Sequence, residues 1–298
     1  MSNKSLWRLT LEIDHNFEDI IIWKLDDLGI FSYAINYIEN KEELKQLLIW
    51  LPKSDWDQQK KEELEIIFRN FFNYNGYQLN SLCWVSLEEE DWLNSWKQYW
   101  EPTPIGKNFL ILPSWMELPK RYQNKYIIRI EPGAAFGTGS HPSTALCLEM
   151  FDNISIKGKK ILDVGCGSGI LSIASKKLGG SIIHCIDNDY LAIRSTKENL
   201  KLNFGQFIDF QLFEGSFLEI ANKNILTKYD LVLCNILANV IIPLIPDLYK
   251  ILSLNGKLIL SGIMSSQKEE IIKILNLYYL KVDHVLSKKD WVCIRASK

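Results

Sequence analysis

Hydrophobic and polar positions along residues 1–87 alternate in patterns that predict a small domain of strands and helices. Residues 6–13 alternate as a strand does, and residues 15–28 have helical spacing up to Gly29. A second helix is predicted to begin at the capping residue Ser54 and to stop at Gly76. Three more strands are predicted at 31–38, 44–51 and 79–87. The order β-α-β-β-α-β predicts an α+β ferredoxin-like domain, an antiparallel sheet with both helices on one face.

From residue 159 onward, short apolar runs alternate with helical stretches. The runs are nearly unbroken, as expected for parallel strands that are buried on both faces. Strands are predicted at 160–164, 181–186, 208–213, 231–234 and 257–260, and helices at 170–178, 190–202, 239–252 and 266–278. Two last strands, 281–287 and 291–296, add a hairpin to the sheet edge. The pattern predicts a doubly wound α/β domain with a seven-stranded sheet.

Residues 88–104 separate these two patterns and are predicted to form a linker helix. Trp92, Trp96 and Trp100 recur every four residues, which places the indoles along one helical face. Pro102 ends the helix, since a residue before proline disfavours helical geometry. The indoles are interpreted either as core between domains or as a surface that contacts the substrate. The predicted domains are therefore 1–87 and 105–298, joined by 88–104.

The composition is that of a globular protein, with 298 residues, 47% hydrophobic and 23% charged. No apolar run reaches the roughly 18 residues that span a bilayer, and residues 1–10 lack the apolar core of a signal peptide. The six cysteines include no C-x-x-C pair, so neither a zinc knuckle nor a redox dithiol is indicated. We expect a cytoplasmic protein with reduced thiols, no metal site and no membrane contact.

Charge is unevenly distributed, although the net charge is only -2. Residues 1–100 contain 10 basic and 18 acidic residues, a net charge of -8, which leaves +6 for residues 101–298. An acidic N-terminal surface repels phosphate backbones and attracts basic proteins, so direct nucleic-acid recognition is not expected. The alternative is a solvated surface that only confers solubility.

A glycine-rich turn follows the first strand of the C-terminal domain. The letters D-V-G-C-G-S-G at 163–169 place three glycines where a strand becomes a helix, so the backbone can approach a ligand without an intervening Cβ. Ile170 stands where a dinucleotide-binding turn requires its third glycine, which disfavours NAD. Asp187, 22 residues after Gly165, closes the next strand and can accept hydrogen bonds from ribose hydroxyls. The turn and this acid together predict a nucleoside site.

This combination resembles motifs I and II of the class I S-adenosylmethionine-dependent methyltransferases. The resemblance implies that Gly165, Gly167 and Gly169 pass beneath the methionine part of S-adenosylmethionine. It also implies that Asp187 holds the ribose and that Asp163 belongs to the cofactor site. The chain has no G-K-[ST] after the glycines, which agrees with a sulfonium ligand rather than a phosphate.

A second glycine-rich segment, residues 131–144, joins a strand to a helix. Phe136 within it is a candidate to cover the apolar side of a ligand. The letters P-G-A-A-F-G-T-G-S-H-P-S-T are similar to the signature of the ribosomal protein L-eleven methyltransferase family. The resemblance extends over nearly the whole chain through E-D-W-L-N-S-W-K at 90–97, I-L-P-S-W at 111–115, N-I-L-A at 235–238 and L-S-G-I at 260–263.

The family resemblance implies several roles. Thr144 matches the threonine that contacts the cofactor, Asn235 matches the active-site asparagine, and the N-terminal domain resembles the one that recognises the substrate. His141 by itself is more typical of a capping or core histidine than of a catalyst. Ser143 stands where threonine is usual in the family, but the hydroxyl is retained.

Asn235 directly follows the predicted strand 231–234, and open α/β sheets bind ligands at this end of their strands. Many amino-group methyltransferases continue from here with an aromatic residue that stacks on a planar group. This chain continues with Ile236, Leu237 and Ala238, which favours an aliphatic amine as acceptor. No general base is identifiable, so Asn235 and nearby carbonyls are predicted to orient the amine.

The leading hypothesis is a protein N-methyltransferase that uses S-adenosylmethionine to modify lysine ε-amines, and the N-terminal amine, of ribosomal protein L-eleven. Only the family resemblance supplies this substrate. One alternative is a methyltransferase of the same fold that acts on lysines of another protein. Another is a ribosome-docking factor in which the cofactor only stabilises the fold. An NAD-dependent oxidoreductase is disfavoured by Ile170 and by the lack of a convincing hydride-relay residue.

Overall fold

The computed structural model describes residues 6–30, 32–38, 41–79, 81–87, 100–131, 139, 141–206, 208–222 and 227–298. Contacts divide the chain into Met1–Glu101 and Pro102–Lys298, called unit 1 and unit 2 below. Residues 88–99 of the expected linker helix, with Trp92 and Trp96, lie outside the described residues. At its other end, Thr103 and Pro104 belong to strand β5 (Thr103–Ile105).

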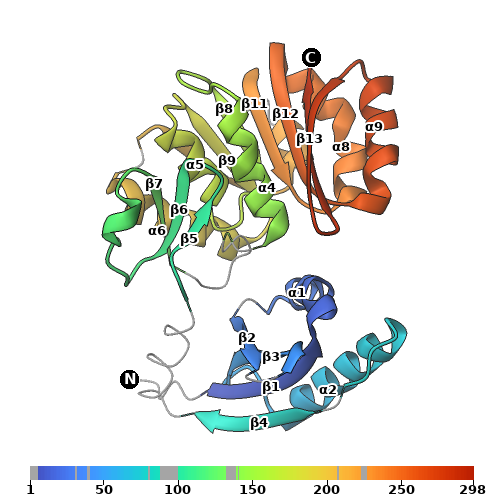
Figure 1. The fold of residues 1–298 in the computed structure, drawn as a ribbon. Coiled ribbons are helices and arrows are strands. Elements are labelled where there is room, and N and C mark those ends of the chain that lie inside the picture. Colours follow the sequence, from blue (N-terminus) through green and yellow to red (C-terminus); the bar gives the residue numbers. More distant parts are fainter. Residues whose placement is uncertain are drawn as a thin grey trace. The chain divides into compact units, whose positions relative to one another are not determined.

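Unit 1 contains a four-stranded antiparallel sheet and two helices (Figure 1). The strand order is β2-β3-β1-β4, with β1 between β3 and β4. This small antiparallel α+β domain is the one that the sequence predicted. Its elements are β1 (Leu6–Asp14), α1 (Glu18–Asp27), β2 (Tyr33–Ile38), β3 (Lys41–Pro52), α2 (Gln58–Tyr74) and β4 (Leu82–Leu87).

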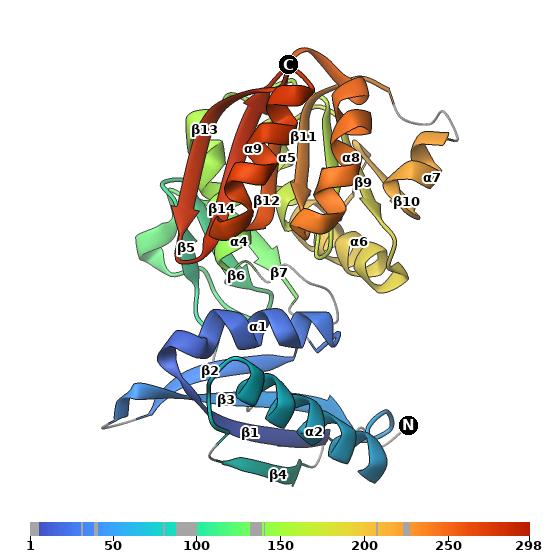
Figure 2. The ribbon, with the colours of Figure 1, turned by 90° about the vertical axis from the view of Figure 1, so that its right-hand side faces the viewer.

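Both helices of unit 1 pack on one face of its sheet (Figure 2). Alternate residues of β1, such as Leu9 and Leu11, meet Ile21 of α1 and Phe68 of α2 in one buried cluster. The alternation arises because successive strand residues point to opposite faces.

The prediction that Ser54 caps the second helix is wrong. Residues 53–55 form a turn after β3, closed by a hydrogen bond from the Asp55 amide to the Pro52 carbonyl. The helix therefore begins at Gln58, and the Asp57 side chain caps it by accepting a hydrogen bond from the Lys60 amide at 2.9 Å.

Unit 2 contains the predicted seven-stranded sheet, in the order β10-β9-β8-β11-β12-β14-β13. The first five strands are parallel, and the C-terminal hairpin adds two antiparallel strands. The strands are β8 (Ile161–Val164), β9 (Ile183–Asp187), β10 (Phe210–Glu214), β11 (Tyr229–Asn235), β12 (Leu252–Met264), β13 (Lys281–Lys288) and β14 (Trp291–Ser297). The helices are α4 (Pro142–Met150), α5 (Ile170–Lys177), α6 (Tyr190–Phe204), α7 (Phe217–Asn222), α8 (Ala238–Ile251) and α9 (Lys268–Leu277).

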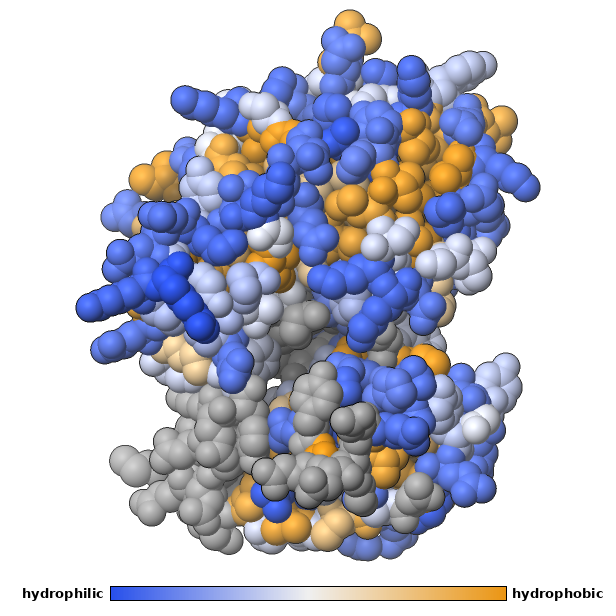
Figure 3. Space-filling model, in the orientation of Figure 1, coloured by the Kyte–Doolittle hydropathy of each residue, from blue (hydrophilic) through white to orange (hydrophobic). Residues whose placement is uncertain are grey.

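Helices cover both faces of this sheet (Figures 1 and 2). Leu231 and Leu233 of β11 join a cluster that includes α4 and α5, whereas Val232 and Cys234 join the cluster with α8 and α9. All six cysteines are free thiols. Among the described residues, no helix combines the length and the apolar character needed to cross a membrane. Figure 3 shows a visible surface of unit 2 that is mostly hydrophilic, with apolar side chains gathered in patches.

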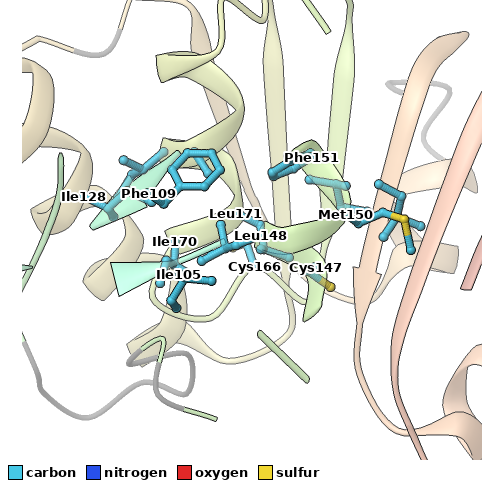
Figure 4. Close-up of a cluster of buried hydrophobic side chains, with 14 of the residues drawn as sticks. Ile105, Phe109, Ile128, Cys147, Leu148, Met150, Phe151, Cys166, Ile170 and Leu171 are labelled. Carbon is cyan, nitrogen blue, oxygen red and sulfur yellow. The ribbon is translucent and has the colours of Figure 1, made fainter. Parts of the chain in front are cut away.

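A three-stranded sheet completes unit 2, and of its strands the sequence predicted only the one that precedes residue 131. It consists of β5, β6 (Phe109–Pro113) and β7 (Tyr126–Ile130). Phe109 and Ile128 project from it into the cluster formed by Ile170 and Leu171 of α5 (Figure 4). This sheet therefore supports the helix that begins at the glycine turn.

Candidate active site

The candidate site lies at the carboxyl ends of adjacent strands. Strand β11 pairs with β8 on one side and with β12 on the other. Cys234 lies opposite Val164, so the next residues, Asn235 at the end of β11 and Gly165 just after β8, lie at the same edge of the sheet. The sheet topology thus brings the predicted catalytic asparagine and the predicted cofactor turn together.

The three glycines of the turn all have left-handed backbones. The φ angles are +71° at Gly165, +53° at Gly167 and +78° at Gly169. Residues other than glycine rarely adopt such angles. A Cβ on Gly169 would also lie 2.9 Å from the Thr196 side chain. The turn therefore requires glycine, and it leads into the N-terminus of α5.

One acid holds the turn, and a second holds the helix that follows it. Asp187 at the end of β9 accepts a hydrogen bond from the Gly167 amide at 2.9 Å through Oδ2, and one from the Asp189 amide at 3.0 Å through Oδ1. Asp163 is fully buried, and its Oδ2 accepts a hydrogen bond from the Ser172 hydroxyl at 2.7 Å. Burial raises the pKa of Asp163 to about 7, although this hydrogen bond opposes the rise.

Asn235 is held by α4. Its Nδ2 donates to Oγ1 of Thr144 at 3.2 Å, and the Thr144 side chain is fully buried. The Asn235 Oδ1 is buried and has no hydrogen-bond partner among the residues that the structure describes. A buried carbonyl oxygen of this kind costs free energy unless a donor reaches it. The geometry therefore leaves this acceptor beside the glycine turn for a ligand that carries N–H groups, and the Oδ1 of Asp163, just before the turn, is likewise buried without a partner among the described residues.

Two polar residues of α6 hold the turn and were not found from the sequence. Thr196 Oγ1 donates to the Gly167 carbonyl at 2.8 Å, and Asn199 Nδ2 donates to the Ser168 carbonyl at 2.9 Å. The Asn199 Oδ1 also accepts from the amide of Glu131, where the second glycine-rich segment begins. On sequence alone, polar helix residues are interpreted as solvated, and only this tertiary contact distinguishes these two.

Phe136 lies outside the described residues, as does most of its segment. Of the metal-ligating residue types within the described ranges, no group of three or more is arranged to hold an ion.

His141 caps α4, the helix that carries Thr144. Its Nδ1 accepts a hydrogen bond from the Ser143 amide at 3.3 Å, and its ring packs edge-on against Trp291. Burial, together with the charge of Lys289, lowers the pKa of His141 to about 4. The imidazole is therefore neutral at pH 7 and serves as an acceptor.

This burial makes the stability of unit 2 depend on pH. Between pH 6.5 and 4, His141 becomes protonated in the unfolded chain but stays neutral in the folded one. The free energy of unfolding therefore decreases as the pH is lowered through this range, by about 3 kcal/mol for this group. His141→Asn keeps a capping oxygen and lacks this titration. We expect its stability deficit relative to wild type, measured by urea unfolding, to shrink from pH 7 to pH 4. A constant deficit would contradict the assignment.

Comparisons with known proteins agree with this geometry. The model of the family described as ribosomal protein L11 methyltransferase (PrmA) matches residues 5–298. A ribosomal protein L11 methyltransferase of Prochlorococcus marinus strain MIT 9515 is 51% identical over 98% of this chain and 97% of its own. The ribosomal protein L11 methyltransferase of Prochlorococcus marinus strain MIT 9301 is 50% identical over 100% of this chain and 98% of the length of that protein.

A solved structure is similar as well. The crystal structure of a ribosomal protein L11 methylase from Lactobacillus delbrueckii subsp. bulgaricus superposes with a TM-score of 0.61 and is 31% identical. The superposition covers 67% of this chain and 99% of that one. With the family match spanning both units, the chain belongs to the ribosomal protein L11 methyltransferase family.

Proposed function

We propose that this protein transfers methyl groups from S-adenosylmethionine to lysine ε-amines, and to the N-terminal α-amine, of ribosomal protein L11 in the cytoplasm. The buried, unpartnered Oδ1 of Asn235 beside the glycine turn is the observation that carries the proposal. The relatives, similar to this chain over nearly its full length, supply the substrate.

The residues of the site fit the cofactor. The left-handed glycines at 165, 167 and 169 shape the turn that leads into α5, and the Asn235 Oδ1 beside it lacks a donor among the described residues. Asp187 has lone pairs left for ribose hydroxyls. When bound, the cofactor supplies a methyl carbon activated by a sulfonium. Asp163 is proposed to belong to the cofactor site as well, because its buried Oδ1 has no hydrogen-bond partner among the described residues. Thr144, which accepts a hydrogen bond from Asn235, is proposed to contact the cofactor, and Phe136 is proposed to cover the apolar side of the cofactor.

The acceptor amine must be neutral to react. A lysine with a pKa near 10.4 requires about 4.6 kcal/mol to be neutral at pH 7, whereas an α-amine near 7.8 requires only about 1 kcal/mol. Asn235 Oδ1 accepts an N–H of the neutral amine and thereby directs its lone pair towards the cofactor side of the site. The proton leaves to water, since the described part of the site presents no dedicated base.

Unit 1 is proposed to recognise the protein substrate, with 1–87 as the recognition domain, 88–104 as a connector and 105–298 as the methyltransferase domain. The net charge of -8 over residues 1–100 suits a basic partner. The same charge disfavours direct contact with RNA.

Incubation of the purified chain with L11 and S-adenosylmethionine tests the proposal. Intact-mass spectrometry of L11 is expected to show whole methyl increments, which peptide mapping assigns to lysines and the N-terminus. Methylation of other proteins but not of L11 would favour a different protein substrate. Cofactor binding without any transfer would instead favour a docking role.

A further inference from the structure

Ile236, the residue after Asn235, is enclosed by two glycines from neighbouring strands. Gly165 follows β8, and Gly262 lies near the end of β12. These strands flank β11 on its two sides, so the glycines approach Ile236 from opposite directions.

Both approaches are too close for any other residue. A Cβ on Gly165 would lie 2.3 Å from the Ile236 Cγ2 methyl group. A Cβ on Gly262 would lie 2.3 Å from the Ile236 carbonyl oxygen and 2.8 Å from its carbonyl carbon. Gly262 thus lies against the peptide of Ile236 on one side, and Gly165 lies against its Cγ2 methyl group on the other. Ile236 is called the spacer below.

Ile236 directly follows Asn235, the residue proposed to orient the amine. Asn235 lies opposite Ser261 in the parallel register, and Ser261 donates through its hydroxyl to the Ser143 carbonyl at 3.0 Å. Ser143 precedes Thr144, which accepts the hydrogen bond from Asn235 Nδ2. The Nδ2 end of the Asn235 side chain is therefore tied to α4. The distance from Asn235 to the glycine turn then depends on how Ile236 packs between Gly165 and Gly262.

We propose that Ile236 is a positioning residue that sets the separation between the glycine turn and Asn235 Oδ1 through its Cγ2 methyl group, with Gly262 as its support. The inference rests on the proposed function, because a set separation matters for in-line transfer to an amine. Misplacement by about 1 Å can lower such a rate on the order of 100-fold.

Two substitutions at Ile236 separate shape from volume. Ile236→Val removes a carbon but keeps the methyl on Cβ, whereas Ile236→Leu keeps the volume and loses that methyl. We expect the kcat of Ile236→Leu to fall about tenfold below that of Ile236→Val, with KM for L11 and Kd for S-adenosylmethionine within about threefold. A filler of apolar space would give the reverse order, because leucine fills more volume.

Gly262→Ala tests the support, with Gly158→Ala as its matched control. Both glycines have left-handed backbones, at φ +78° and +73°, but nothing lies within 4 Å of a Cβ on Gly158. Each substitution therefore carries a similar backbone cost. Only Gly262→Ala is expected to lower kcat, by about tenfold or more. Equal kcat values for the two variants would overturn the role of Gly262.

A readout without substrate separates this inference from the proposed function. The side-chain amide resonances of Asn235 in NMR spectra are expected to shift more in Ile236→Leu than in Ile236→Val. Equal shifts would overturn the spacer role even if L11 is methylated. A larger shift in Ile236→Leu, in a protein whose wild type does not methylate L11, would overturn the proposed function and leave the spacer role supported.

Discussion

Asn235→Ala is expected to lower kcat for L11 methylation by about 100- to 1,000-fold, the range seen when one preorganised polar contact to a reacting group is removed. The affinity for S-adenosylmethionine should change by less than about threefold, because the glycine turn and Asp187 are bonded to each other and not to Asn235. Single-turnover kinetics and calorimetric titration of the cofactor measure the two effects separately.

Asn235→Asp is the informative partner variant. It retains an oxygen at the Oδ1 position, and the Thr144 hydroxyl can donate to the new oxygen that replaces Nδ2. We expect Asn235→Asp to be more active than Asn235→Ala, since only the latter lacks an acceptor for the amine. An alanine variant with wild-type turnover would remove Asn235 from the mechanism.

Asp187→Ala is expected to weaken S-adenosylmethionine binding by about 100-fold or more. Hydrogen bonds to a charged group contribute about 1.5–3 kcal/mol each, and the carboxylate is proposed to serve two ribose hydroxyls. In this variant the Gly167 amide also loses the carboxylate oxygen to which it donates, so the turn becomes less ordered. Calorimetric titration of the purified chain gives the affinity directly.

Asp189→Ala is the matched control for this variant. The Asp189 side chain caps α6 by accepting from the Leu191 amide at 2.8 Å. Its loss should cost about 1 kcal/mol of stability, with an affinity close to that of wild type. If Asp187→Ala bound the cofactor as tightly as Asp189→Ala does, the ribose assignment would be wrong.

The sequence predicted the larger elements because their apolar runs end at polar residues. Strand β8 ends at Val164 and β11 at Asn235, each within one residue of its predicted end. The helix predicted at 190–202 is found as Tyr190–Phe204. Such patterns are set by residues close in the chain, so one sequence suffices to find them.

The features that the sequence did not reveal depend on contacts between distant residues. Strand β5 has three residues, too few to show alternation. Gly262 must be glycine because the peptide of Ile236 lies where a Cβ would be, and the L-S-G-I letters do not show that contact. Ser54 failed as a cap because the chain forms its turn through residues 53–55 before the helix begins.

The amide of Asn199 joins two segments that are 37 residues apart. It donates to Ser168 in the glycine turn and accepts from Glu131, the residue before the signature segment. Aspartate could not donate at this position, and serine could not span both partners. A mutation that displaces one segment therefore disturbs the other. As sequences diverge, the two segments must either change position together or both keep their positions.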